Sequence, residues 1–321
     1  MSRTAPPGTP ITESSAPSGD ANAPSSAGVA RDARRGVVYA LVAATLFGVS
    51  ATFSKLALRD TTPELLAGLL YLGSGGGLTL LWLGRRLAAK AGTPLARRDV
   101  PWFAASIVAG GVAAPMLLML GLARTTASTG SLLLNLEGAF TAGLAWFVFG
   151  ESFDRRIALG MLVIIAGGVV LSWGGRAELG GFAGPLLVAG ATLAWGVDNN
   201  LTQRFADRDP VQIGMIKGLV AGGVNTAIAL SLGATWPAPP SIAFGLVQGL
   251  VCYGASIVLF VLALRHSGTA RTGASFSTAP FIGTAVSIIV FRERPSATFI
   301  AAAALMLVGV WLLLTKERVS A

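Results

Sequence analysis

Residues 121–151 read GLARTTASTGSLLLNLEGAFTAGLAWFVFGE, and residues 263–293 read ALRHSGTARTGASFSTAPFIGTAVSIIVFRE. The two segments align without gaps at one constant shift, which pairs Gly121 with Ala263 and Glu151 with Glu293. Each contains an apolar run of bilayer-spanning length, since a hydrocarbon core of about 30 Å needs roughly 20 apolar residues in a helix. The chain therefore has two halves with one plan, and each half contains membrane helices.

Ten such apolar runs fill the chain. They are continuous rather than alternating, and lipid admits only helices or closed barrels, so the runs predict helices. The sequence thus predicts an all-α integral membrane protein with ten transmembrane helices. The expected helices are Gly36–Ala57, Glu64–Leu83, Trp102–Leu122, Thr126–Phe149, Ile157–Trp173, Phe182–Leu201, Val211–Leu232, Ile242–Leu264, Thr269–Phe291 and Ala297–Leu314.

The composition agrees with a membrane protein. Hydrophobic residues make up 53% of the chain and charged residues 12%, whereas a soluble domain carries about 25% charged residues. The single cysteine, Cys252, excludes an internal disulfide and is interpreted as a small core residue. The net charge is +9, but the sequence outside the expected spans contains no basic face with interleaved aromatic residues. No nucleic-acid partner is therefore expected.

The loops predict the orientation in the membrane. If the N-terminus is inside, the inner segments hold 17 Lys and Arg side chains and the outer segments hold 5. Lys and Arg accumulate on cytoplasmic loops, so we expect a multi-pass protein of the inner (plasma) membrane with both termini in the cytoplasm. Residues 1–35 are predicted to form a disordered cytoplasmic N-terminal tail, because residues 1–30 have almost no large apolar side chains. Residues 316–321 are predicted to form a cytoplasmic C-terminal tail.

The repeat divides the chain into residues 36–174 and 182–315. Within the halves, Phe47-Gly48-Val49 resembles Trp195-Gly196-Val197, and each of these helices is followed by a turn with an aspartate and a proline. Five crossings per half would place the two halves in opposite orientations. Such inverted repeats are the plan of secondary transporters, with a substrate site near the membrane midplane.

Together these features resemble the EamA type of the drug/metabolite transporter superfamily. The stretches that carry the resemblance are LLLNLEGAFTAGLAWFVFGE and RTGASFSTAPFIGTAVSIIVFRE, and it covers nearly all of residues 36–314. The first repeat departs from the family pattern, with Gly138 where the second has Pro280. The resemblance implies movement of small metabolites across the inner membrane, often the export of amino acids or related compounds.

Ionisable residues inside membrane helices are costly and mark candidate pathways or proton relays. Asp198 and Lys217 lie at similar depth on consecutive antiparallel helices. They could form a self-neutralising ion pair with a structural role only, or open to bind a zwitterionic substrate. Lys55 lies near a helix end, where its long side chain is expected to reach the interface.

Glu137 lies about halfway along the fourth helix, with no cation at a matching depth. An unpaired carboxyl in a low dielectric is expected to stay protonated much of the time, which suits a proton-coupling group. The alternative is a permanently neutral acid that bonds to Asn135 or to a backbone carbonyl.

Neighbouring polar and aromatic residues could shape a binding cavity. Trp195 lies three residues before Asp198 and shares its helix face, and the hydroxyl of Tyr253 needs a partner within the eighth helix. Pro280 should kink the ninth helix. The kink could free backbone carbonyls near Ser277 to contact a ligand, or it could have a mechanical role only. Asn199 could contact substrate or join two helices.

We therefore expect a secondary transporter that works by alternating access, with protons as a candidate coupling ion. The alternatives are a passive facilitator with the same cavity and, with less support, a membrane protein without transport function. An enzyme is not expected, because the only histidine, His266, falls in an expected loop and only one cysteine is present. No phosphate-binding motif supports ATP-driven transport, and no cofactor or metal is predicted. The expected partners are a small-molecule substrate and the lipid bilayer, with the protein itself a monomer or homodimer.

Overall fold

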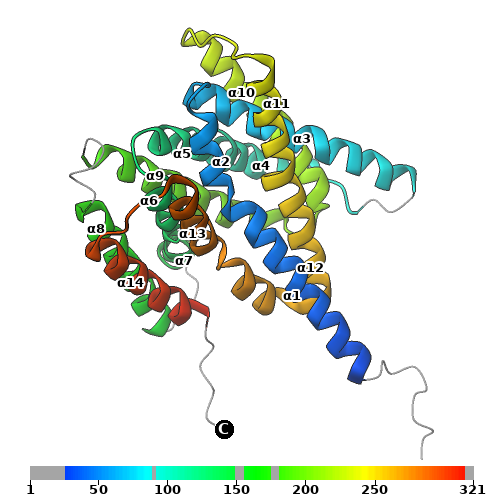
Figure 1. Ribbon diagram of the computed structural model, residues 1–321. Helices are drawn as coiled ribbons and strands as arrows, with labels where there is room; N and C mark the ends of the chain where they lie inside the picture. The colour runs from blue at the N-terminus through cyan, green and yellow to red at the C-terminus, as the bar shows by residue number, and fades with distance from the viewer. Residues whose placement is uncertain (1–25, 89–91, 149–154, 175–180, 315–321) are drawn as a thin grey trace, which may run out of the picture.

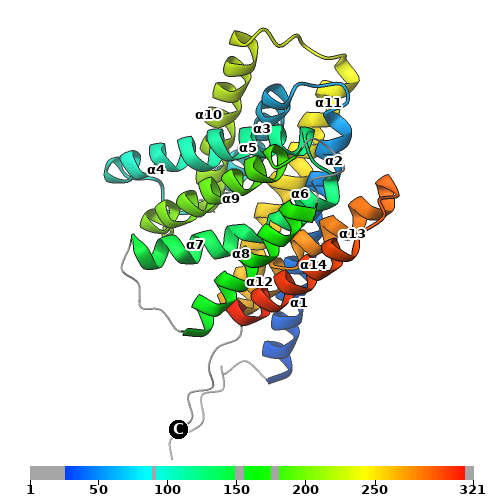
Figure 2. The ribbon, with the colours of Figure 1, turned by 90° about the vertical axis from the view of Figure 1, so that its left-hand side faces the viewer.

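The computed structural model describes residues 26–88, 92–148, 155–174 and 181–314. Every regular element in these ranges is helical, and the helices cross one another in one bundle (Figures 1 and 2). The greater part of the expected N-terminal tail, residues 1–25, lies outside the described residues, as do the C-terminal tail and Glu151.

The first half contains α1 Ser26–Gly48, α2 Ser50–Ala57, α3 Pro63–Leu87, the short 3-10 turn η1 Arg97–Asp99, α4 Val100–Ser106, the π-helical segment η2 Ile107–Ala113, α5 Ala114–Ala123, α6 Ala127–Leu133, α7 Leu136–Phe147 and α8 Arg155–Gly174. The second half contains α9 Ala183–Thr202, the 3-10 turn η4 Gln203–Phe205, α10 Pro210–Ser231, α11 Pro239–Gln248, the π-helical segment η5 Gly249–Ala255, α12 Ser256–Phe276, α13 Ala279–Phe291 and α14 Ala297–Leu314.

Eight helical stretches of the described chain are long and apolar enough to cross a membrane. The expected fourth and sixth spans are not among these eight. The fourth is interrupted between α6 and α7, and the sixth carries the polar run Asp198-Asn199-Asn200 in α9. An all-helical, multi-pass membrane protein is therefore confirmed, while the number of ten spans stays a prediction.

Both halves contain a π segment and a helix break, and these lie at positions that the sequence repeat aligns. The π segments η2 and η5 begin at Ile107 and Gly249, which are related by the same shift that pairs Glu151 with Glu293. The break between α6 and α7 falls at Leu134–Asn135, and the break between α12 and α13 falls at Ser277–Thr278. Asn135 and Ser277 are also paired by this alignment, so the repeat extends to the helix distortions.

Two helix boundaries differ from the expectation. Helix α1 begins at Ser26, well before the expected start of the first span at Gly36. Helix α12 continues through the expected loop around His266, whose Nδ1 lies 2.8 Å from the Leu262 carbonyl oxygen. Polar side chains that bond to a carbonyl one turn earlier can remain helical, and Ser267 does the same with Ala263 at 3.0 Å.

The second-half break comes just before Pro280, which is the second residue of α13. Proline has no N–H to donate and is tolerated in the first turn of a helix, so its position fits a helix that starts at this point. In the first half, Gly138 stands at the matching position, yet the chain breaks at the same place. The break therefore belongs to the shared plan and does not require the proline.

Small residues bring α3 close to its neighbours. A Cβ added at Gly73 would lie 2.0 Å from the Leu246 carbonyl oxygen of α11, and one at Gly249 would lie 2.0 Å from the Leu70 carbonyl oxygen. Helices α3 and α10 meet through Gly75 and Gly218 in the same manner. Such contacts let membrane helices approach closely.

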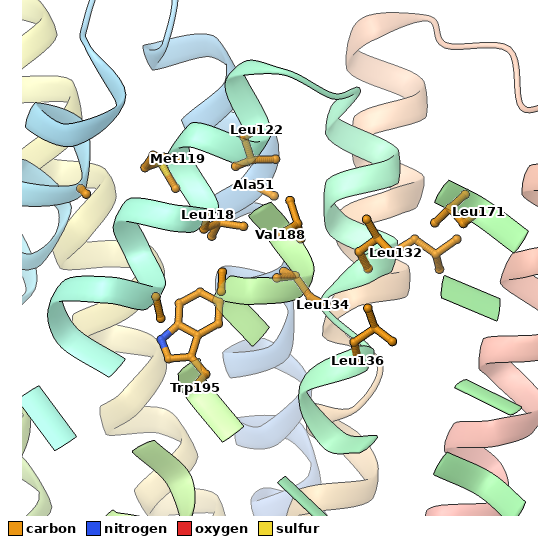
Figure 3. Packing of buried hydrophobic residues seen from close by; sticks show 14 of the residues in the cluster. Ala51, Leu118, Met119, Leu122, Leu132, Leu134, Leu136, Leu171, Val188 and Trp195 are labelled. Atoms are coloured by element: carbon orange, nitrogen blue, oxygen red, sulfur yellow. The ribbon is translucent and has the colours of Figure 1, made fainter. Parts of the chain in front are cut away.

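The largest buried apolar cluster joins the two halves. Figure 3 shows part of it, including Leu118 and Leu122 of α5, Leu132 of α6, and Val188 and Trp195 of α9. Because α9 opens the second half and α5 and α6 belong to the first, the interior of the bundle is built from both.

A polar cluster joins the connection between α3 and α4 to that between α9 and α10. Buried Asp209 accepts bonds from Arg85 at 3.1 Å and from the backbone N–H groups of Gly92 at 2.9 Å and Val211 at 3.0 Å. Beside it, the Nε of Arg208 donates to Asp99 at 2.7 Å. Burial alone would raise the pKa of Asp209, but the two backbone donors and Arg85 outweigh it and hold the pKa below its usual range.

The glycine contacts predict unequal effects for two substitutions in α3. Gly73→Ala should lower stability by about 1–3 kcal/mol, because the added methyl meets backbone that cannot move aside. Gly76→Ala should be neutral or stabilising by up to about 1 kcal/mol, because it meets open space and alanine favours helix. Thermal unfolding in detergent measures both, and equal melting temperatures would contradict the packing described.

The cluster around Asp209 predicts an acid-sensitive contribution to stability. Because the pKa is lower in the folded protein, the stabilisation is complete above the ordinary value of about 3.9 and is lost as pH falls through the folded-state value. Asp209→Asn should lower the melting temperature at pH 7 and reduce the loss of stability on acidification. Asp60→Asn, at the exposed aspartate of the matching turn, is the control and should change neither.

Candidate functional site

A cavity of about 430 Å³ lies inside the bundle. Its walls come from both halves of the chain, with six of the residues singled out in the sequence among them: Glu137, Trp195, Asp198, Asn199, Lys217 and Tyr253. The other lining residues are Phe47, Tyr71, Ser74, Gly214, Gly218, Ser256, Ile257, Phe260 and Phe276.

Asp198 and Lys217 form an ion pair on one wall of the cavity. The Lys217 ammonium donates to both carboxylate oxygens of Asp198, at 2.6 and 2.8 Å. The hydroxyls of Ser106 and Thr202 donate to the same Asp198 Oδ1, at 2.5 and 3.1 Å. A Cβ at Gly110 would lie 1.9 Å from the other oxygen, so glycine provides room for the carboxylate. The charge of this largely buried acid is thus held by an ammonium and two hydroxyls.

Glu137 faces the same cavity from the first turn of α7, just after the helix break. Its Oε1 accepts a hydrogen bond from Asn199 at 2.9 Å, and the same amide nitrogen lies 3.1 Å from the Thr141 hydroxyl. Asn135, the partner considered from sequence, instead donates to the Leu132 carbonyl oxygen at 2.8 Å. The acid of α7 is therefore linked across to the polar run of α9.

The π segment η2 supplies carbonyl acceptors near the site. The Gly110 carbonyl oxygen accepts bonds from the Tyr71 hydroxyl at 2.7 Å and from the Trp195 indole at 3.1 Å. The Gly111 carbonyl oxygen accepts from Asn225 at 3.0 Å. A π turn shifts the hydrogen-bond pattern of a helix and recurs at functional sites, and here it fixes two rings that line the cavity.

Five other lining residues are aromatic. Ring centroids are 6.0 Å apart for Tyr71 and Tyr253, and 5.8 Å for Phe47 and Tyr253. They are 5.6 Å apart for Phe47 and Phe276, and 4.9 Å for Phe260 and Phe276. These five rings form a continuous chain, which we call the aromatic wall. The charged and amide groups come from α7, α9 and α10, whereas these five rings come from α1, α3, η5 and α12, so the two kinds of lining group lie on different helices.

Three residues predicted for the site, or for the helix kink beside it, do not line the cavity. Asn135 and Ser277 occupy the two helix breaks, and the Ser277 hydroxyl bonds to Ala274 of its own helix at 2.8 Å. Pro280 lies just beyond the second break. These three residues lie at or just beyond the two helix breaks.

Sequence reasoning missed most of the aromatic wall. Phe47 was already aligned with Trp195 by the repeat, and that match could have marked it as a lining residue. Ser74 lies within the cluster Gly73–Gly77, which suggests helix packing alone. Ser106 and Thr202 carry no charge, so nothing in the sequence distinguishes them from other small polar residues in the spans.

Lys55 bonds to the end of a neighbouring helix, and its expected reach to the interface stays a prediction. Its ammonium donates to the carbonyl oxygens of Leu122 at 2.5 Å and Thr125 at 2.8 Å, at the end of α5. Nearby, the Ser128 hydroxyl donates to Glu293. Among the described residues no group of three His, Cys, Asp or Glu side chains could hold a metal ion.

The ion pair predicts strongly non-additive substitutions. Removing one partner of a buried pair leaves an uncompensated charge and costs about 3–5 kcal/mol, whereas replacing both can be nearly neutral. Lys217→Met should therefore destabilise the protein strongly, and Asp198→Asn/Lys217→Met together should recover most of that loss. Thermal unfolding of the two single variants and the double variant measures the coupling, and additive losses would show that the pair does not form.

Comparison with known proteins agrees with this architecture. The EamA-like transporter family model matches residues 34–173 and 182–315. An uncharacterized transporter of Methanothermobacter thermautotrophicus is 28% identical over 295 residues, which cover 87% of this chain and 85% of that protein. A crystal structure of a protein that is 19% identical superposes with a TM-score of 0.63 over 89% of this chain and 99% of the other, and so shares the fold. The resemblance read from the sequence is thus confirmed, and the chain belongs to the EamA-like transporter family of membrane transport proteins.

Proposed function

We propose that this protein is a secondary transporter of small organic metabolites, in particular amino acids or related amines. The observation that carries the proposal is the cavity lined by charged and aromatic residues from both halves of the bundle. Its volume of about 430 Å³ is within the usual range of small-molecule sites. Family membership and the transporter relative point to transport rather than to an enzyme.

The proposed mechanism is alternating access between two inverted five-helix repeats, residues 36–174 and 182–315. The repetition of the π segments and the helix breaks at one spacing supports two equivalent units. A rocking movement of one unit against the other would expose the cavity to each side in turn. We place the protein in the inner (plasma) membrane with both termini in the cytoplasm, on the distribution of Lys and Arg among the loops, and as a monomer or homodimer.

We further propose that protons drive the transport through Glu137. Its carboxyl lies at the cavity, with Asn199 as a hydrogen-bond donor, and can exchange a proton for a substrate group. Asp198 is less suited to this role, because Lys217 and two hydroxyls already hold its charge. The alternative is a passive facilitator in which Glu137 only binds substrate.

The test is substrate-dependent pH change in proteoliposomes, across a library of amino acids and amines. A proton flux should appear with one class of compound, and Glu137→Gln should abolish it while the purified variant keeps its melting temperature. Asp60→Asn is the control and should transport as the wild type does. Uptake without proton flux, unchanged in Glu137→Gln, would make the protein a facilitator, and a folded protein that moves no compound of the library would overturn the proposal of transport.

A further inference from the structure

The charges at the cavity do not balance. Lys217 is the one cation among the described lining residues, and both oxygens of Asp198 hold it, at 2.6 and 2.8 Å. Glu137 has an amide donor, Asn199, but no cation among the described residues that line the cavity. When Glu137 is ionised, the cavity therefore carries one uncompensated negative charge, which a cationic ligand would neutralise.

A ligand that carried a carboxylate would need a cation of its own. Among the described lining residues that cation is Lys217, and recruiting it would remove the ammonium from Asp198. Breaking one side of a buried ion pair is strongly unfavourable. The charge pattern thus favours a monocation over a zwitterion.

The aromatic wall determines what the rest of the ligand should be. The aromatic wall is a chain of five adjacent rings, on helices other than those that carry the charged groups. The rings run from Tyr71 through Tyr253, Phe47 and Phe276 to Phe260. Aromatic rings favour offset or edge-on contact with another ring. Their faces also attract a cation that lies close to them. A flat aromatic body with a short cationic arm would contact both the aromatic wall and Glu137.

We propose that the cavity selects a monocationic amine with one aromatic ring, its ammonium at Glu137 and Asn199 and its ring against the aromatic wall. This inference rests on the proposed transport function and narrows its substrate class. It also gives Glu137 a specific part in binding, since the ammonium and the coupling proton would compete for one carboxylate.

The test compares three compounds on the purified full-length protein and in proteoliposomes. Phenethylamine has the ring and the ammonium, phenylalanine adds only a carboxylate, and butylamine lacks the ring. Phenethylamine should bind about tenfold or more tightly than either of the others, which corresponds to about 1.4 kcal/mol or more. Uptake should follow the same order.

Two variants separate the charge from the ring. Glu137→Gln should weaken the binding of phenethylamine about tenfold and leave the binding of the neutral 2-phenylethanol unchanged. Phe47→Leu should weaken the binding of phenethylamine but not that of butylamine. This variant tests the inference even if Glu137→Gln fails to fold. Asp60→Asn changes an exposed residue that is not among those lining the cavity, and it serves as the matched control for purification and reconstitution.

Each contrary result has its own meaning. Phenylalanine that binds as tightly as phenethylamine would overturn the selection of a monocation, and equal binding of butylamine would overturn the role of the aromatic wall. Uptake of other library compounds without phenethylamine would overturn this inference and leave the transport function standing. A folded protein that moves no compound at all would overturn the transport function itself.

Discussion

Inside lipid, every backbone group must find a partner within the protein, and this constraint shapes the site. Where a helix departs from the regular pattern, its carbonyl oxygens need other donors. At η2 those donors are Tyr71 and Trp195, which meet at the Gly110 carbonyl, and Asn225, which meets the next one. The same irregularity that disturbs the helix therefore anchors two side chains at the cavity.

The two halves use equivalent contacts to hold their helices together. Ser106 donates to Asp198 of the sixth expected span, and Gln248, which stands where Ser106 does in the repeat, donates to the Ser50 carbonyl of the first span at 3.0 Å. Ser50 and Asp198 themselves correspond, under the shift that aligns Phe47 with Trp195. Each half thus contributes a polar residue next to its π segment that bonds to the opening helix of the other half. These contacts hold the two halves together around the cavity, which is lined by residues of both halves.

Hydropathy and the repeat were sufficient to predict the membrane class, the family and six of the cavity residues. These predictions depend only on composition and on the spacing of residues along the chain, both of which can be read from the sequence. The bond between Glu137 and Asn199 was not predictable, because it depends on how α7 and α9 are rotated against each other. The π segments were missed for a related reason, since a one-residue shift in hydrogen bonding leaves no mark in hydropathy. The loop expected at His266 was wrong because polarity was taken as a helix end, whereas the side chain bonds to its own helix.

Glu137 lies at one of two helix contacts that the repeat makes equivalent, that of α7 with α9, and helix packing gives a reason why the contact of α13 with α1 has no matching acid. Ala279 is the residue that the repeat pairs with Glu137, and a Cβ at Gly48 would lie 2.3 Å from the Ala279 carbonyl oxygen. At Gly196, the residue that matches Gly48, the nearest atom to an added Cβ is the Thr141 backbone nitrogen, at 3.1 Å. Helices α1 and α13 therefore approach more closely than α9 and α7, and the looser contact is the one that admits a glutamate and an asparagine.

Glu137 lines the cavity, in which the described lysine, Lys217, is already paired with Asp198, whereas Ala279 is not among the lining residues. Two uncompensated acids in one low-dielectric site would repel each other when ionised, so each would favour its protonated form. Because Glu137 is the one uncompensated acid among the described lining residues, the cavity meets the condition for binding one cationic group at a time.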